Sequence, residues 1–377
     1  MKFYIPTKRL EEILKPAVKS ASLNKTLQIL THVYIEVDDS EIKVVGANPE
    51  YTVSVKDKVD VSEGGRFLVL GDKFLQIVRS LPDGNVIIEL SKDMLSLYVE
   101  GSSINFSIQT LPVEEYPKQI LEVIETEYNF DISQKEMKKI INKLSNFCAD
   151  DDSIQAVFTG FLFDLKDSGD ITFVTTDTKR MGIYKTSYRA QDEASNLRFV
   201  VPYSTLEVLD DVLSSEGPLS VGVNFDEDRN VKNVVFSTND MIISSSVIAG
   251  KFPEYEAIIP MTVENYAVIN KRSLEEALKR ISVISDKETK KVSFTFDDEE
   301  LKLESENSIL GSASEVVPCK FVGKREYIYF NYEFILDYLS VLDSEEFFWG
   351  FNHYESASKF WSEEEKEFLY IAMPLRR

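Results

Sequence analysis

The sequence predicts an α+β protein that is built from three similar units in tandem. Segments 69–81, 201–213 and 330–342 each continue from an apolar strand end into an amphipathic helix. Apolar residues recur at i, i+3 and i+7, which marks one helix face, and Phe74, Leu206 and Ile335 occupy equivalent positions. We expect each unit to hold two helices and two small antiparallel sheets.

The other helix of each unit comes earlier, at 7–18, 133–145 and 270–282. Thr7, Ser133 and Asn270 open these helices, and all three are residue types that favour an N-cap position. Pro16 lies inside the first helix, where it is expected to cause a kink.

Alternating apolar and polar residues predict strands between and after the helices. In the first unit these segments are 33–37, 41–45, 51–55, 86–90, 95–99 and 104–108. Segments 111–117 and 251–260 both carry prolines and a tyrosine between units, and they resemble each other. We therefore place domain boundaries at 1–125, 126–254 and 255–377.

The composition is that of an ordinary globular protein, with 43% hydrophobic and 28% charged residues in 377. No long apolar run predicts a membrane span, and the first residues lack the features of a signal peptide, so a cytoplasmic location is expected. Cys148 and Cys319, the two cysteines, are expected to be buried thiols in a reducing compartment.

The net charge of -22 argues against contact with nucleic acid. The first helix of each unit nevertheless carries more bases than acids. If the three helices face a common side, their bases form a basic stripe on an acidic body. Such a stripe could meet phosphates without reading the base sequence of the nucleic acid. Alternatively, the helices present ordinary solvated faces with i,i+4 ion pairs. The bases are Lys8, Arg9, Lys15, Lys135, Lys138, Lys139, Lys143, Lys271, Arg272, Lys279 and Arg280.

Catalytic motifs are weak. There is no glycine-rich phosphate loop, and neither His32 nor His353 completes a catalytic set. The acidic run 150–152, with Asp164, could bind Mg²⁺, but no second acidic motif completes a two-metal site. We expect this run and the tract 363–365 to be solvated, and we expect no metal and no cofactor.

Several short motifs, in order along the whole chain, resemble the DNA polymerase III beta subunit, the bacterial sliding clamp family. The terminal residues resemble its M-P-[MVL]-R-L ending, and Thr176–Met181 resembles T-D-G-H-R-L. The motifs are Met1-Lys2-Phe3, Leu14-Lys15-Pro16, Thr26-Leu27-Gln28-Ile29-Leu30, Leu81-Pro82-Asp83-Gly84, Thr176-Asp177-Thr178-Lys179-Arg180-Met181, Phe252-Pro253-Glu254-Tyr255 and Met373-Pro374-Leu375-Arg376-Arg377.

The resemblance implies three clamp domains per chain and a head-to-tail dimer that closes as a toroidal ring around duplex DNA. Such a ring is a non-catalytic processivity factor, associated with the nucleoid, that binds DNA without sequence specificity. The implied partners are double-stranded DNA, a second copy of the chain, the replicative polymerase catalytic subunit, the clamp loader and other proteins with clamp-binding peptides. The basic helices would then face DNA, together with Lys25.

The resemblance also implies two protein contacts. Ring closure would join Phe106 and Ile108 of one copy to Val283 and Ile284 of the next. A pocket for partner peptides would use Phe158, Thr176, Thr178, Lys179, Met181, Pro253, Ile258, Ile371, Met373, Pro374 and Leu375.

This chain departs from the family pattern at three places. Asn24-Lys25 stands where many clamps have a DNA-contacting arginine, which is why Lys25 is the expected contact. Thr178-Lys179 stands where the family has Gly-His, so the peptide preference is expected to differ. Segment 349–368 is unlike that of other members.

Two other hypotheses are open from the residues alone. A carboxylate–metal hydrolase would use the acidic run 150–152, and its activity would disappear with Asp151→Ala. A protein-binding scaffold would be a monomer, indifferent to charge reversal at Lys138 and Lys139.

Overall fold

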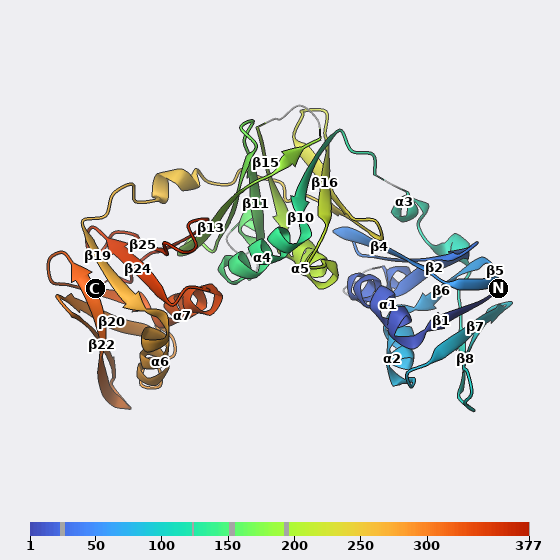
Figure 1. The fold of residues 1–377 in the computed structure, drawn as a ribbon, viewed down its shortest axis with the longest axis horizontal. Coiled ribbons are helices and arrows are strands. Elements are labelled where there is room, and N and C mark those ends of the chain that lie inside the picture. Colours follow the sequence, from blue (N-terminus) through green and yellow to red (C-terminus); the bar gives the residue numbers. More distant parts are fainter. Residues whose placement is uncertain (23–26, 123, 151–154, 192–195, 377) are drawn as a thin grey trace. The chain divides into compact units, whose positions relative to one another are not determined.

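The computed structural model describes residues 1–22, 27–122, 124–150, 155–191 and 196–376 (Figure 1). These residues divide into two compact units. The first unit holds 1–138, 188–193 and 204–247, and the second holds 139–187, 194–203 and 248–377. None of the described helices is long and apolar enough to cross a membrane.

The first repeat lies wholly in the first unit and follows the predicted order of helices and strands. Its elements are β1 (Lys2–Pro6), α1 (Thr7–Ser22), β2 (His32–Asp38), β3 (Glu41–Ala47), β4 (Tyr51–Lys58), β5 (Asp60–Glu63), β6 (Gly65–Leu70), α2 (Gly71–Ser80), β7 (Asn85–Ser91), β8 (Met94–Val99) and β9 (Asn105–Gln109). A short helix, α3 (Lys118–Leu121), follows in the connection to the second repeat.

The second repeat has the same order of elements and contributes to both compact units. Its elements are β10 (Tyr128–Ser133), α4 (Gln134–Leu144), β11 (Gly160–Leu165), β12 (Asp170–Thr176), β13 (Arg180–Ser187), β14 (Arg189–Ala190), β15 (Leu197–Pro202), α5 (Tyr203–Val212), β16 (Pro218–Phe225), β17 (Val231–Ser237) and β18 (Met241–Ser246).

The third repeat lies wholly in the second unit. Its elements are β19 (Asn265–Asn270), α6 (Lys271–Ile281), β20 (Lys291–Asp297), β21 (Glu300–Asn307), β22 (Gly311–Val322), β23 (Glu326–Asn331), α7 (Tyr332–Val341), β24 (Glu346–Phe351), β25 (Ser358–Trp361) and β26 (Phe368–Ala372). Segment 349–368, which is expected from the sequence to differ from the family pattern, supplies core residues here, since Trp349 and Phe360 are fully buried and in ring contact.

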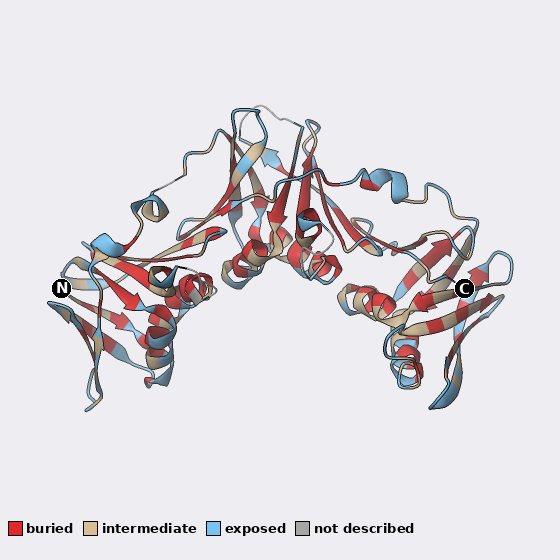
Figure 2. Cartoon of the chain, turned by 180° about the vertical axis from the view of Figure 1, so that it is seen from behind, coloured by how far each residue is buried: buried red, intermediate tan, exposed pale blue. Residues whose placement is uncertain are grey.

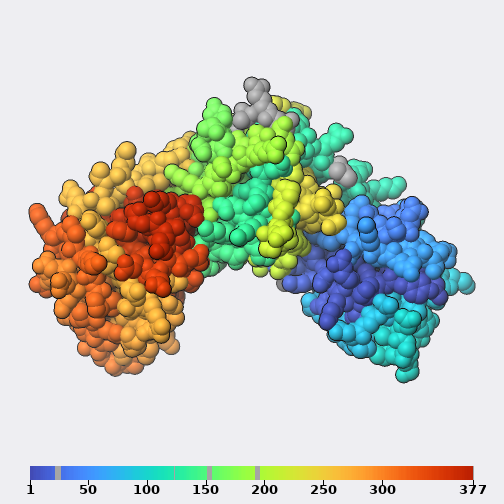
Figure 3. Space-filling view, viewed as in Figure 1, coloured from blue at the N-terminus to red at the C-terminus, as the bar shows by residue number. Residues whose placement is uncertain are grey.

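The strands form sheets that run across the junctions between repeats, whereas the sequence suggested separate small sheets. A nine-stranded sheet joins the first two repeats through β4 and β18, and a twelve-stranded sheet joins the last two through β13 and β26. Figure 3 shows the C-terminal residues (red) directly against those of the second repeat (green). Because each of these two sheets includes strands of the second repeat, one part of this repeat belongs to the first compact unit and the other part belongs to the second.

The helices bury the residues that the repeat predicted. Phe74, Leu206 and Ile335 are each fully buried, and the buried side of the helices faces the strands (Figure 2). The hydrophobic core of the first repeat contains residues of α1, α2 and both neighbouring sheets. Helical periodicity therefore predicted the packing correctly.

Two of the three predicted N-caps are confirmed. The Ser133 hydroxyl accepts a hydrogen bond from the Glu136 amide at 3.1 Å, and the Asn270 side chain accepts from the Ser273 amide at 3.0 Å. The prediction for Thr7 is wrong, because its hydroxyl donates to the carbonyls of Pro82 and Gly84. Helix α1 continues through Pro16 to Ser22.

A buried ion pair joins α4 to the third repeat within the second unit. Lys143, 4% exposed, donates to the carboxylate of Glu365, which is 6% exposed. The same carboxylate accepts from the Ser344 amide at 2.8 Å, and Lys143 lies 2.8 Å from Asp343. The expectation of a solvated acidic tract is therefore wrong for Glu365, because the fold brings a lysine to it.

Replacing Lys143 with Met should destabilise the protein by about 3–5 kcal/mol, because it leaves the Glu365 charge buried without its partner. Lys139→Met is the matched control. Its pair with Glu367 is 2.7 Å long but about a third exposed, and should contribute about 1 kcal/mol or less. Urea unfolding would measure both. A double variant, Lys143→Met with Glu365→Leu, should recover much of the loss, whereas equal losses from the two single variants would contradict the assignment.

The same pair should make stability sensitive to acid. Burial by itself would raise the pKa of Glu365, but hydrogen bonds from Lys143 and Ser344 outweigh it and hold the pKa below its ordinary value. The stabilisation is therefore complete at neutral pH and is lost as pH falls below about 4.3. The stability difference between wild type and Glu365→Gln, followed by urea unfolding across pH, should shrink with acidification. A difference that stays constant would exclude this role.

Candidate functional site: a pocket beside strands β13 and β26

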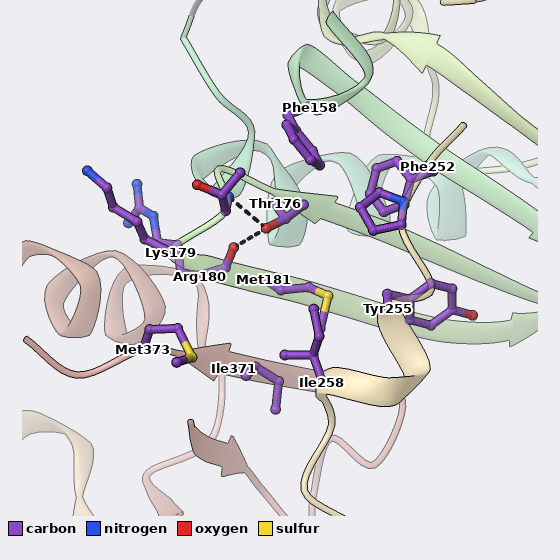
Figure 4. Close-up of a pocket in the computed structure, with 12 residues that line it drawn as sticks. Phe158, Thr176, Lys179, Arg180, Met181, Phe252, Tyr255, Ile258, Ile371 and Met373 are labelled. Carbon is purple, nitrogen blue, oxygen red and sulfur yellow. Dashed lines mark hydrogen bonds between the residues drawn. The ribbon is translucent and has the colours of Figure 1, made fainter. Parts of the chain in front are cut away.

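A pocket of about 150 Å³ opens on the second unit, where β13 pairs with β26. Met181 and Ile371 are register partners on these two strands and form its centre. Figure 4 shows Lys179 and Arg180 at one end of the pocket and Tyr255 at the other. The remaining lining residues are Phe158, Thr176, Thr178, Phe252, Pro253, Ile258 and Met373.

The pocket has a buried apolar floor and exposed apolar edges. Phe158, Met181 and Ile371 are at most 5% exposed, whereas Ile258 is 48% and Met373 40% exposed. A cavity of this volume, lined by aliphatic and aromatic side chains, can hold one group of about the size of benzene. The arrangement is suited to one inserted apolar side chain from a partner whose neighbouring residues lie over the edges.

A buried carboxylate anchors the wall formed by segment 252–258. The Tyr255 hydroxyl donates to Asp164 at 2.8 Å, and Asp164 is fully buried on β11. Burial and this hydrogen bond raise the pKa of Tyr255. Lys166 lies 2.9 Å from Asp164, and the Arg198 guanidinium stacks over the Tyr255 ring. Asp164 therefore pairs with cations and a phenol, which is a structural role.

The turn before β13 forms the opposite edge of the pocket, and it is unusual in its backbone. Thr178 has a φ of 75°, in the left-handed region that a β-branched residue rarely occupies. The Asp177 carboxylate accepts from the amides of Lys179 and Arg180 at 2.9 and 3.0 Å. The Met373 amide donates to the Lys179 carbonyl at 2.8 Å, which ties the turn to the residue after β26.

Most of the residues proposed from the resemblance meet in this pocket. The nine that line it are Phe158, Thr176, Thr178, Lys179, Met181, Pro253, Ile258, Ile371 and Met373. Pro374 and Leu375 do not line it, because the chain leaves β26 and the Leu375 amide donates to the Tyr329 carbonyl on β23. Sequence reasoning missed Arg180, Phe252 and Tyr255 as lining residues, although all three lie inside the motifs that carried the resemblance.

The basic residues of α1, α4 and α6 are largely engaged in local contacts. Lys8 pairs with Asp83, Arg9 with Asp57, Lys15 with Asp211, Arg272 with Glu276, Lys279 with Glu275 and Arg280 with Glu315. Lys138 donates to the carbonyls of Asp210 and Leu213, and Lys271 to that of Leu342. Lys135 is exposed.

Two residues of the expected DNA face differ from the other bases. Lys143 is not available to a phosphate, so the expectation for it is wrong, because its amine is buried against Glu365. Lys25 lies outside the described residues.

The residues expected at ring closure lie on an edge strand and in the segment just after a helix. Phe106 and Ile108 are on β9, the edge strand of the five-stranded sheet, and are partly packed on the core. Val283 and Ile284 follow α6, and Val283 is 72% exposed.

The described residues contain no group of three or more histidine, cysteine or acidic side chains that could hold a metal ion. Asp150 is exposed, and Asp151 and Asp152 lie outside the described part of the chain. Cys148 and Cys319 are buried free thiols, as expected, and burial raises the pKa of Cys319 to about 11. His32, at the start of β2, contacts the Thr31 hydroxyl through Nδ1 at 3.3 Å.

Comparison with known proteins agrees with this architecture. Family models of the DNA polymerase III beta subunit match residues 1–121 (N-terminal domain), 131–254 (central domain) and 256–376 (C-terminal domain). The chain belongs to the DNA polymerase III beta subunit family. It is a beta sliding clamp, the processivity factor of that polymerase and a non-catalytic subunit.

Relatives and solved structures match along the whole chain. The beta sliding clamp of Pseudomonas aeruginosa is 24% identical over 97% of this chain and 98% of its own, and that of Haemophilus influenzae is 24% identical over 100% of both. A Pseudomonas aeruginosa clamp structure bound to griselimycin superposes with a TM-score of 0.91 at 22% identity, covering 100% of both chains. A Thermotoga maritima structure has a TM-score of 0.89 at 25% identity, covering 100% of this chain and 99% of its own.

Proposed function

We propose that two copies of this chain close head to tail into a ring around duplex DNA, and that the ring tethers the replicative polymerase to it. One observation carries this proposal, namely the repeated pairing of strands across the junctions between repeats. The last strand of the second repeat, β18, pairs antiparallel with β4 of the first. The last strand of the third repeat, β26, pairs antiparallel with β13 of the second.

In both junctions the last strand of one repeat pairs with a strand of the repeat before it. Among the described strands, one strand of the first repeat and one of the third lack such a partner. The last strand of the first repeat, β9, is the edge of its sheet. The counterpart of β4 and β13 in the third repeat is β22, whose segment from Gly311 to Val317 pairs only with β21. Unpaired strand edges invite another chain. Pairing β9 of one copy with β22 of the next repeats the existing junction and gives a heterologous contact that can close a ring.

Apolar side chains near these strands support the same contact. Phe106 and Ile108 lie on β9, while Val283 and Ile284 lie just after α6 in the third repeat. Val316 on β22 is 47% exposed, and Ile309 at the hairpin before it is 90% exposed. Covering such residues with a second copy would remove apolar area from water.

We further propose that the described bases of α1, α4 and α6, with the exception of Lys143, face the phosphates of the encircled DNA, together with Lys25. Their ion pairs are mostly on the surface, where a pair contributes about 1 kcal/mol or less and a phosphate can replace the carboxylate. Lys8, Arg272 and Lys279 have side chains that are 62% or more exposed. The net charge of -22 would then discourage DNA from binding elsewhere.

The pocket on the second unit is proposed to receive clamp-binding peptides of the polymerase, the clamp loader and other partners. Its apolar floor, its exposed edges and its size for one inserted side chain support this role. We propose domain boundaries at 1–125, 126–254 and 255–377, which the ranges of the three family models support. A cytoplasmic, nucleoid-associated location follows from the proposed role on DNA.

The topology of DNA retention tests the ring. The protein is loaded onto a nicked circle with a clamp loader and ATP, and the DNA is then cut once. Loss of bound protein after cutting is expected, because topology and not affinity would hold the ring. Equal retention on circular and linear DNA would mean ordinary electrostatic binding and would contradict the proposal. In the same assay, Lys135→Glu with Arg272→Glu should reduce loading several-fold, whereas Lys118→Glu with Lys324→Glu, an equal total charge change at two exposed residues outside these helices, should not.

Ring closure can be tested at Val283. Because this side chain is 72% exposed in a single chain, Val283→Glu should leave the fold intact and convert dimers to monomers, as measured by sedimentation velocity. Met261→Glu is the matched control, since Met261 is 97% exposed and lies outside the proposed contact. A dimer that survives Val283→Glu, or a wild-type monomer at micromolar concentration, would exclude this interface.

A further inference from the structure

The turn from Asp177 to Arg180 combines an unfavourable backbone conformation with a position at the edge of the pocket. Thr178 has a φ of 75°, where the Cβ of an L residue lies close to the following carbonyl oxygen. Both Thr178 and Lys179 line the pocket and are exposed. Outliers of this kind persist where the surroundings enforce them, and they are concentrated at functional sites.

Several hydrogen bonds hold the turn in this conformation. Thr176 contributes two through its hydroxyl, which accepts from the Thr178 amide at 3.0 Å and donates to the Arg180 carbonyl at 2.6 Å. The Asp177 carboxylate accepts from the amides of Lys179 and Arg180 and from the Arg180 side chain. The backbone of the turn is therefore fixed before any partner binds, which lowers the entropy lost on binding.

The two basic side chains at this edge differ in the ion pairs that they form. The Arg180 guanidinium is paired with two carboxylates, those of Asp177 and Asp337. Lys179 forms no ion pair with the described residues and is exposed. Figure 4 shows its side chain extending from the edge, away from the apolar floor. The opposite end of the pocket carries acidic neighbours, since Glu254 and Glu256 flank Tyr255.

We propose that the turn from Asp177 to Arg180 determines the specificity of this pocket. The left-handed backbone conformation of Thr178 fixes the position of this edge of the pocket. Lys179 selects peptides that carry an acidic side chain next to the apolar side chain inserted in the pocket. This inference rests on the proposed function of the pocket as a peptide site. Lysine attracts the acidic side chain as a mobile point charge, so the preference depends on charge and is sensitive to salt.

Peptide binding to the intact protein tests the selection. The probes are two short fluorescein-labelled peptides, each with one Leu to enter the pocket, that differ only in having Asp or Asn beside this residue. Fluorescence anisotropy should show about fivefold tighter binding of the Asp peptide, the ratio that an exposed ion pair provides. High salt or Lys179→Ala should abolish the preference, and Lys179→Glu should reverse it. Lys324→Glu, an equal charge change on the turn before β23, should leave it unchanged.

A variant of the floor separates this inference from the proposed function. Met181→Glu should abolish binding of both peptides. If Met181→Glu does so but wild type binds both peptides equally, the selection by Lys179 is wrong while the peptide pocket stands. If wild type binds neither peptide, both the selection and the pocket's assigned role are wrong.

Thr178→Gly tests the role of the backbone. Glycine adopts the left-handed region without strain, so the variant should melt at a higher temperature than wild type. It should also discriminate less between the two peptides, because the edge that carries Lys179 becomes freer. Full discrimination by Thr178→Gly would overturn the role given to Thr178.

Discussion

The backbone pairing of β13 with β26 is the interaction on which the rest of the second unit depends. This ladder joins two repeats into one sheet, with Arg180 opposite Ala372 and Tyr184 opposite Phe368. It places Met181 beside Ile371, and so it creates the pocket floor from residues that are far apart in sequence. Backbone hydrogen bonds suit this purpose, because they fix register and leave the side chains free to vary.

The ladder also accounts for two features next to the pocket. The Met373 amide, just after β26, donates to the Lys179 carbonyl and so holds the edge of the pocket in place. Nearby, Lys143 of α4 meets Glu365, which precedes β26 by a few residues. A buried pair of this kind contributes little net stability, but it penalises any arrangement that separates its members. The junction is thus specified by strand register and by charge.

Two segments expected to differ from the family pattern lie in physically different places. Aromatic residues of segment 349–368 pack inside the third repeat, where Trp349 contacts Phe294, Phe330 and Phe360. Cores tolerate such changes when volume and patterning are kept. Thr178 and Lys179 lie instead on the edge of a pocket, where Thr178 has a left-handed backbone conformation and Lys179 carries a positive charge. The first segment therefore contributes to packing, and the second lies at the edge of the candidate site.

The sequence by itself determined the threefold repeat, the helix faces and most of the pocket residues, because periodicity and short motifs are local properties. Phe74, Leu206 and Ile335 could be recognised as core positions for this reason. Only the tertiary structure decided that sheets cross the junctions, that Lys143 and Glu365 are buried partners, and that Tyr255 is anchored by Asp164. These contacts join residues separated by 91 positions or more, and nothing local distinguishes them from solvated charges.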